Sequence, residues 1–214
     1  MTEQQPYELL QRYPHFELRR YPAHLVAEVE VTGSFDRAGN AAFRPLFNYI
    51  SGTNTARRTV AMTAPVVQRS ASTAGATSEK VAMTAPVVQR GPLPEGSSSG
   101  GETTRGVHVV AFVLPAGMTE DSAPIPADPR VRLRTVPAST AAVLRFSGST
   151  SARAFGRRNE ELQQSVAAAG LIPVGAPRFA RFDPPFTPGF LRRNEVVQDV
   201  AEAPGGTAGG VPAP

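Results

Sequence analysis

The order of secondary-structure patterns along this chain, which occurs twice, limits the possible fold more than any other feature. In each half, two alternating apolar and polar stretches precede one amphipathic helix and further strands. We expect each initial pair of strands to be antiparallel neighbours. The segments are, in order, strands at 16–21 and 24–31, a helix at 34–51, a buried strand at 107–114, strands at 130–136 and 138–146, a helix at 149–169, and strands at 177–182 and 195–200.

A repeated order of strands and helices predicts an α+β domain with pseudo-two-fold symmetry. The natural arrangement for such a chain is a distorted antiparallel β-barrel with two helices packed against it. The predicted first helix has one apolar stripe, flanked by aromatic residues, and Pro45 interrupts its pattern. The stripe consists of Ala38, Ala42, Leu46 and Ile50, with Phe35, Phe43 and Phe47 beside it.

A string of ten residues occurs twice without change, at 60–69 and again at 81–90. Each copy has the composition of a strand, but Pro65 and Pro86 cannot donate to a ladder and belong at an edge or a bulge. Only one copy need occupy the main sheet. The spacing from Asn54 favours the first copy, whereas proximity to the strand at 107–114 favours the second.

Composition excludes several classes of site. The chain has no cysteine, which excludes a thiolate nucleophile and a zinc ribbon and favours a cytoplasmic location. The net charge is +4, and all basic residues except Lys80 are arginine. These arginines are scattered, so we expect no nucleic-acid partner. The chain shows no signal peptide and no membrane-spanning stretch.

The pattern of titratable residues predicts no enzyme. The three histidines, His15, His24 and His108, belong to no catalytic or metal-binding motif. We expect His24 to be solvated or salt-bridged and His108 to be a core histidine or to face a ligand cavity. Residues 192–195, Arg-Arg-Asn-Glu, form either an anion site or an ion-paired loop that holds the last strand.

Several stretches together resemble the SOUL / haem-binding protein family. They cover roughly residues 14 to 200 in order, and the most specific are the Met-Thr-Ala-Pro-Val string and the terminal Asp-Pro-Pro and Arg-Arg-Asn-Glu motifs. The full set is Phe16–Ala23, Ser51–Asn54, Val60–Val66, Phe112–Pro115, Phe182–Pro185 and Arg192–Val196.

The resemblance implies a distorted barrel of about eight strands with two helices, built from a βαββ-type duplication. It also implies non-covalent binding of haem or a porphyrin in an apolar cleft beside the first helix. This chain has Arg20 where some members place a histidine, and Asn40 and Asn48 where others have basic residues. The expected contacts, with no metal ligand among them, are Arg37, Phe43, Arg44, Leu46, Phe47, Ile50, Met62 and Met83.

We therefore expect a flexible N-terminus over 1–13, a SOUL-like domain over 14–200 with a partly disordered loop at 70–106, and a disordered tail over 201–214. The predicted function is non-catalytic tetrapyrrole binding, as a carrier or buffer. An alternative hypothesis is a protein-interaction module that uses residues 59–105, since loops of this length are uncommon in compact domains. A third is an enzyme with Glu195 as its base.

Overall fold

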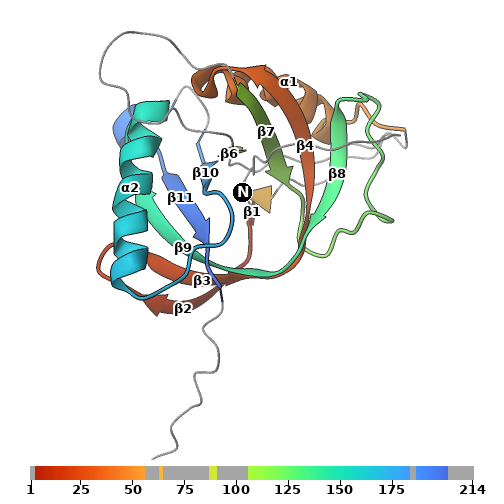
Figure 1. Ribbon diagram of the computed structural model, residues 1–214. Coiled ribbons are helices and arrows are strands. Elements are labelled where there is room, and N and C mark those ends of the chain that lie inside the picture. Colours follow the sequence, from red (N-terminus) through yellow and green to blue (C-terminus); the bar gives the residue numbers. More distant parts are fainter. Residues whose placement is uncertain (1–2, 56–62, 65–86, 91–105, 184–186, 202–214) are drawn as a thin grey trace, which may run out of the picture.

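The computed structural model describes residues 3–55, 63–64, 87–90, 106–183 and 187–201, and Figure 1 shows their arrangement. Two α-helices and a short 3-10 helix accompany the strands of these residues. The elements are β1 (Glu3–Gln4), β2 (Glu8–Arg12), β3 (Glu17–Tyr21), β4 (His24–Gly33), α1 (Phe35–Ile50), β5 (Thr63–Ala64), β6 (Val87–Arg90), β7 (Gly106–Val113), β8 (Val131–Val136), β9 (Ser139–Phe146), α2 (Ala152–Ala168), β10 (Arg178–Arg181), η1 (Gly189–Leu191) and β11 (Asn194–Asp199).

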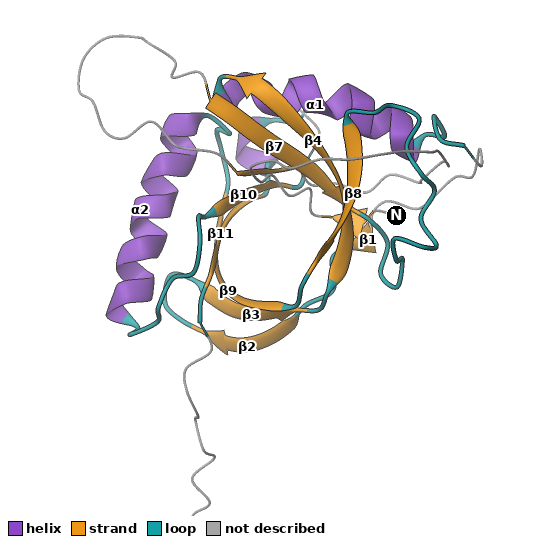
Figure 2. Cartoon of the chain, turned by 45° about the vertical axis from the view of Figure 1, so that its right-hand side comes forward, coloured by secondary structure: helices purple, strands orange, loops and turns teal. Residues whose placement is uncertain are grey.

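Nine strands form one antiparallel sheet in the order β2-β3-β9-β11-β10-β6-β7-β4-β8. Figure 2 shows these strands curving around a common axis, with α1 and α2 on the outside. The predicted α+β class and its two helices are confirmed. Within the described residues no pairing joins the end strands β2 and β8, so a closed barrel stays a prediction.

The predicted repetition of element order is present in the sheet. The first half contributes β3, β4, α1, β6 and β7, and the second contributes β8, β9, α2, β10 and β11. From one end the main order runs β3-β9-β11-β10, and from the other it runs β8-β4-β7-β6. The first strand of each half therefore pairs with a strand of the other half. The two halves also adjoin where β6 pairs with β10.

The predicted pairing of the first two strands in each half was wrong. β3 pairs with β2 and β9, whereas β4 pairs with β7 and β8. A Pro-Ala dipeptide makes both connections, at 22–23 and at 137–138. Tight hairpins need residues that accept positive φ, which proline cannot adopt, so the chain crosses to the other half instead of turning back.

The N-terminal segment includes a strand that the sequence analysis placed in a flexible region. Residues 8–12 form β2, which pairs with β3 with a register shift between Leu9 and Gln11. An ion pair between Arg20 and Glu8, at 2.9 Å, spans the two strands. The register shift breaks the alternation along β2, and its residues are exposed or half-buried, so no apolar pattern indicated a strand.

The second copy of the duplicated string supplies β6 to the main sheet. The described residues of the first copy, Thr63–Ala64, pair in parallel with β1 as β5. The prolines and methionines of both copies lie outside the described residues, as does most of the span 59–105 on which the interaction-module hypothesis depends. The expected disorder at 70–106 and 201–214 also falls almost wholly outside them.

Two apolar clusters pack the helices onto the sheet. The predicted stripe of α1 is fully buried against β4, β7 and β8, and α2 buries Phe155, Leu162 and Val166 against β9, β10 and β11. Phe35, at the start of α1, lies edge-on to Phe155 and Phe179 of the second cluster. Asp36 Oδ1 accepts a hydrogen bond of 2.7 Å from Ala152 N, so the first turn of α1 caps α2.

We predict that Phe155→Ala lowers the free energy of unfolding by about 3–5 kcal/mol, because its fully buried ring contacts Phe35, Phe146 and Phe179. Urea unfolding followed by circular dichroism measures the change. The matched control is Phe190→Ala, whose ring is 78% exposed and should cost less than about 0.5 kcal/mol. Equal losses in both variants would contradict this account of the core.

Candidate functional site

Two side chains of α1 form an aromatic pair at the edge of its buried face. The rings of Phe43 and Phe47 stack with their centroids 5.6 Å apart and their planes 17° from parallel. Phe43 also meets Phe112 of β7 at 5.8 Å. Both phenylalanines are half-buried against the first apolar cluster. Among the described apolar residues that were predicted to contact the ligand, these two are therefore the ones whose side chains remain accessible to solvent.

The other apolar residues predicted for the site lie deeper. Leu46 and Ile50 have no exposed surface and pack on the sheet beneath α1. They support the aromatic pair from behind and cannot touch a ligand on the surface of the helix. Met62 and Met83, the remaining predicted contacts, lie outside the described residues.

The two predicted cationic contacts, Arg37 and Arg44, are exposed on α1. Seven residues on an α-helix make almost two turns, which places them on one side of the helix about 10 Å apart. Arg44 lies three residues before Phe47, a spacing that makes side chains neighbours on the surface of a helix. Within the described residues neither arginine belongs to an ion pair.

His108 is a core residue of the sheet. It is 1% exposed, its Nε2 lies 3.1 Å from the Gly33 carbonyl oxygen, and its ring meets the edge of Phe35. Burial lowers its pKa, which favours the neutral ring. Its Nδ1 has no hydrogen-bond partner among the described residues. Phe35 precedes Phe43 by about 12 Å along α1, so His108 is remote from the aromatic pair.

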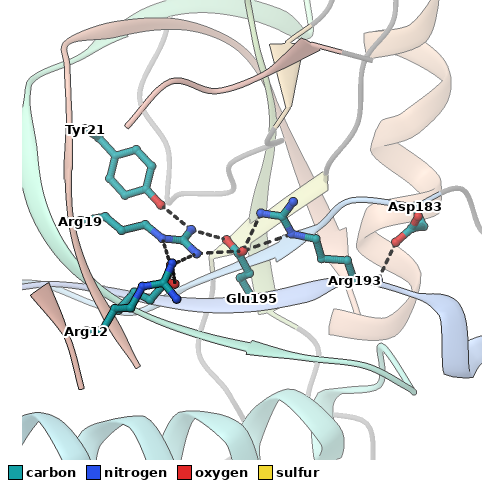
Figure 3. Close-up of polar contacts among 7 residues, drawn as sticks. Arg12, Arg19, Tyr21, Asp183, Arg193 and Glu195 are labelled. Carbon is teal, nitrogen blue, oxygen red and sulfur yellow. Dashed lines mark hydrogen bonds and ion pairs between the residues drawn. The ribbon is translucent and has the colours of Figure 1, made fainter. Parts of the chain in front are cut away.

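A network of charged side chains that was not predicted from the sequence lies on the concave face of the sheet. Figure 3 shows it on the side of β3 and β11 that faces away from α2. Glu195 accepts hydrogen bonds from Arg19 at 3.1 Å and from Arg193 at 2.9 Å. Arg19 also donates to Glu17 and to the Tyr21 hydroxyl. Arg19 and Glu195 are 3% and 2% exposed, so this ion pair is almost dry.

The contacts within this network change the pKa values of Arg19 and Tyr21. Burial alone would lower the pKa of Arg19, but the nearby Tyr21 and Glu195 outweigh it and raise that pKa. Burial raises the pKa of Tyr21 to about 12, and the Glu195 carboxylate adds to this effect. Arg19 therefore stays charged and Tyr21 stays neutral across the physiological range.

These contacts bear on the hypothesis that Glu195 is a catalytic base. Both carboxylate oxygens accept hydrogen bonds from guanidinium groups, one from Arg19 and the other from Arg193. A general base needs a free lone pair within reach of a substrate proton. The arrangement suits a structural ion pair and gives the enzyme hypothesis no support.

The segment before β11 is an ion-paired loop, the second of the two alternatives predicted for residues 192–195. Asp183 accepts from the Arg193 backbone N–H at 2.5 Å, and Arg192 Nε donates to the Thr187 carbonyl oxygen. The Arg193 guanidinium lies 3.9 Å from the centroid of Phe182. These contacts hold the loop against the start of β11.

A second charged group lies on the same face of the sheet, close enough for Arg178 to act on Tyr21. Arg178 pairs with Asp199, and Arg134 Nε donates to Glu28 at 3.0 Å. His24 is half-buried nearby and contacts the Pro22 carbonyl oxygen through Nδ1. Burial lowers the pKa of His24 to about 4, and the positive charges of Arg178 and Arg134 contribute. His24 is therefore neutral near pH 7, and of the two roles expected for it, solvated or salt-bridged, the salt bridge is absent among the described residues.

Alternation along the strands could have placed these residues on one face. Glu17, Arg19 and Tyr21 lie two residues apart on β3, a spacing that puts their side chains on one face of the strand. Their partners could not be assigned, because the pairing of β9 with β3 on one side and with β11 on the other was not predicted. Among the described residues, no cluster of histidine, aspartate or glutamate could hold a metal ion.

Comparison with known proteins gives a family and a fold. A sequence model of the SOUL heme-binding protein family matches residues 2–76 and 72–199. The two matches overlap within the spacer that separates the duplicated strings. No curated protein matched the sequence. Neither described helix is both long and apolar enough to cross a membrane.

Three solved structures illustrate the similarity in fold. The crystal structure of the EcmrR C-terminal domain has a TM-score of 0.55 at 14% identity, over 92% of this chain and 99% of that one. EcmrR in complex with DNA has the same score and identity, over 87% of this chain and 57% of that one. A hydrolase from Listeria innocua has a TM-score of 0.54 at 11% identity, over 94% of both chains. At these identities the likeness concerns the fold alone.

We predict that Glu195→Gln lowers the free energy of unfolding by about 3 kcal/mol, because it removes the charge that compensates the buried Arg19. The exposed pair Arg158–Glu161 provides the control, since Glu161→Gln should cost less than about 1 kcal/mol. Urea unfolding at pH 7 measures both changes. A loss no larger than that of the control would show that the buried pair contributes little.

We also predict that stability falls as the pH is lowered from about 6.5 to about 4 and that His24 causes part of the fall. In this range the unfolded histidine binds a proton that the folded one does not, so acid favours the unfolded state. His24→Gln should flatten this part of the profile. Urea midpoints at several pH values test it, and an unchanged slope in the variant would contradict the assignment.

Proposed function

This chain belongs to the SOUL heme-binding protein family, and from that premise we propose that it binds haem or a related tetrapyrrole without catalysing a reaction. The proposed role is that of a carrier or buffer in the cytoplasm. The family match along most of the chain is the observation that carries the proposal.

We place the tetrapyrrole on the edge of α1 at Phe43 and Phe47. Two nearly parallel, half-buried rings offer a flat apolar surface, which suits a planar macrocycle because aromatic faces stack and bury large areas. Leu46 and Ile50 fix the position of the rings from beneath. Met62 and Met83 remain proposed lining residues.

Arg37 and Arg44 are the proposed partners of the ligand's carboxylates. Guanidinium groups form paired hydrogen bonds with carboxylates, and both arginines are exposed on the side of α1 next to the aromatic pair. Arg44 is the stronger candidate because it lies three residues before Phe47, a spacing that makes side chains neighbours on the surface of a helix. The bound tetrapyrrole would supply its own redox or optical chemistry, and the protein would supply burial and charge.

Binding is proposed to depend on the macrocycle more than on iron. His108 is enclosed in the core near Phe35, and Arg20 stands where some family members place a histidine. Haem and metal-free porphyrin should therefore bind with similar affinity.

A spectroscopic titration with ferric haem and with metal-free protoporphyrin tests this proposal. Replacing both Phe43 and Phe47 by alanine should weaken binding of each ligand about tenfold or more, because the stacking surface is lost. The control is a double alanine variant of Ile172 and Val174, which are exposed at 65% and 49% after α2. Its affinity should match the wild type.

The role of Arg44 has a separate readout. Arg44→Glu should weaken binding of protoporphyrin but leave binding of its dimethyl ester nearly unchanged, because the ester lacks carboxylates. Equal weakening for both ligands would assign Arg44 a structural role. Full affinity in the double phenylalanine variant would move the site away from α1.

A further inference from the structure

A pair of large apolar side chains projects from the surface at η1. Phe190 is 78% exposed and Leu191 is 62% exposed, and they are adjacent in the chain. We call these two residues the apolar tip. Neither the ion-paired loop nor the proposed tetrapyrrole site uses them.

The backbone holds the apolar tip in a defined turn. Leu191 N donates to Pro188 O at 2.9 Å, and Arg192 N donates to Gly189 O at 3.1 Å. Gly148 N also donates to Gly189 O, at 3.0 Å, which ties the turn to the segment before α2. These hydrogen bonds fix the turn, in which both side chains are exposed. Contact between apolar side chains and water is unfavourable, so covering them with a partner would be favourable.

The surroundings of the apolar tip are basic. Arg153 and Arg157 are exposed on the first turns of α2, which begin just after Gly148, and Arg192 follows the tip directly. The nearby carboxylates of Asp36 and Asp183 keep their negative charges while they accept a backbone N–H from Ala152 and Arg193 respectively, so these three arginines exceed the two carboxylates by one positive charge. The charge around the tip therefore favours a negatively charged partner.

We propose that the apolar tip inserts into the surface of an anionic lipid bilayer, with the surrounding arginines near the lipid head groups. Two side chains on a convex turn are far less than the roughly 800 Å² that each partner of a stable protein interface contributes. A bilayer interface accepts a small projecting apolar group without a complementary pocket, and arginines near an anionic surface add to binding. Attachment of this kind needs no membrane-spanning segment.

Co-sedimentation of the full chain with vesicles tests the proposal. The wild type should bind vesicles of phosphatidylcholine with phosphatidylserine, and added salt should weaken this binding. A double serine variant of Phe190 and Leu191 should bind at least about tenfold less well. The matched control replaces the exposed Ile172 and Val174 by serine and should bind as the wild type does.

Arg153→Glu tests the electrostatic part, since it should weaken binding to the anionic vesicles and leave any binding to pure phosphatidylcholine unchanged. Circular dichroism confirms that each variant is folded. The proposal is overturned if the wild type binds neither kind of vesicle. It is equally overturned if the tip variant binds as the wild type does, or if the control loses as much binding as the tip variant.

Discussion

The buried ion pair between Arg19 and Glu195 connects the two halves of this protein. Arg19 lies on β3, the first strand of the first half, and Glu195 lies on β11, the last strand of the second. β9 runs between them, so the side chains meet across one intervening strand. With both groups almost fully buried, neither charge can be removed without leaving the other in an environment that disfavours it.

Much of the architecture follows from periodicity in the sequence, but the choice of strand partners does not. The stripe of Ala38, Ala42, Leu46 and Ile50 predicted the buried face of α1, because helical period and burial are coupled. Alternation shows which residues of a strand share a face but not which strand lies beside it. The exchange of first strands between halves therefore escaped prediction, because the proline of a Pro-Ala connection excludes a tight hairpin but does not show which strand pairs instead.

The difference between local periodicity and strand pairing also explains which side-chain contacts of the candidate site could be predicted. Phe43 and Phe47 were predicted from the edge of the apolar stripe, and the structure brings them together because they are four residues apart on one helix. Arg19 and Glu195, in contrast, are 176 residues apart in the sequence. Contacts set by local spacing could be predicted, whereas the charged network depends on the topology of the whole sheet.

The exchanged first strands also govern how the chain can fold as it is synthesised. When the first half leaves the ribosome, β3 can pair with β2, but its other neighbour, β9, has not yet been made. β4 likewise lacks β8 along one edge. The emerging half therefore exposes strand edges until most of the second half has been translated, which makes completion of the sheet a late event in synthesis.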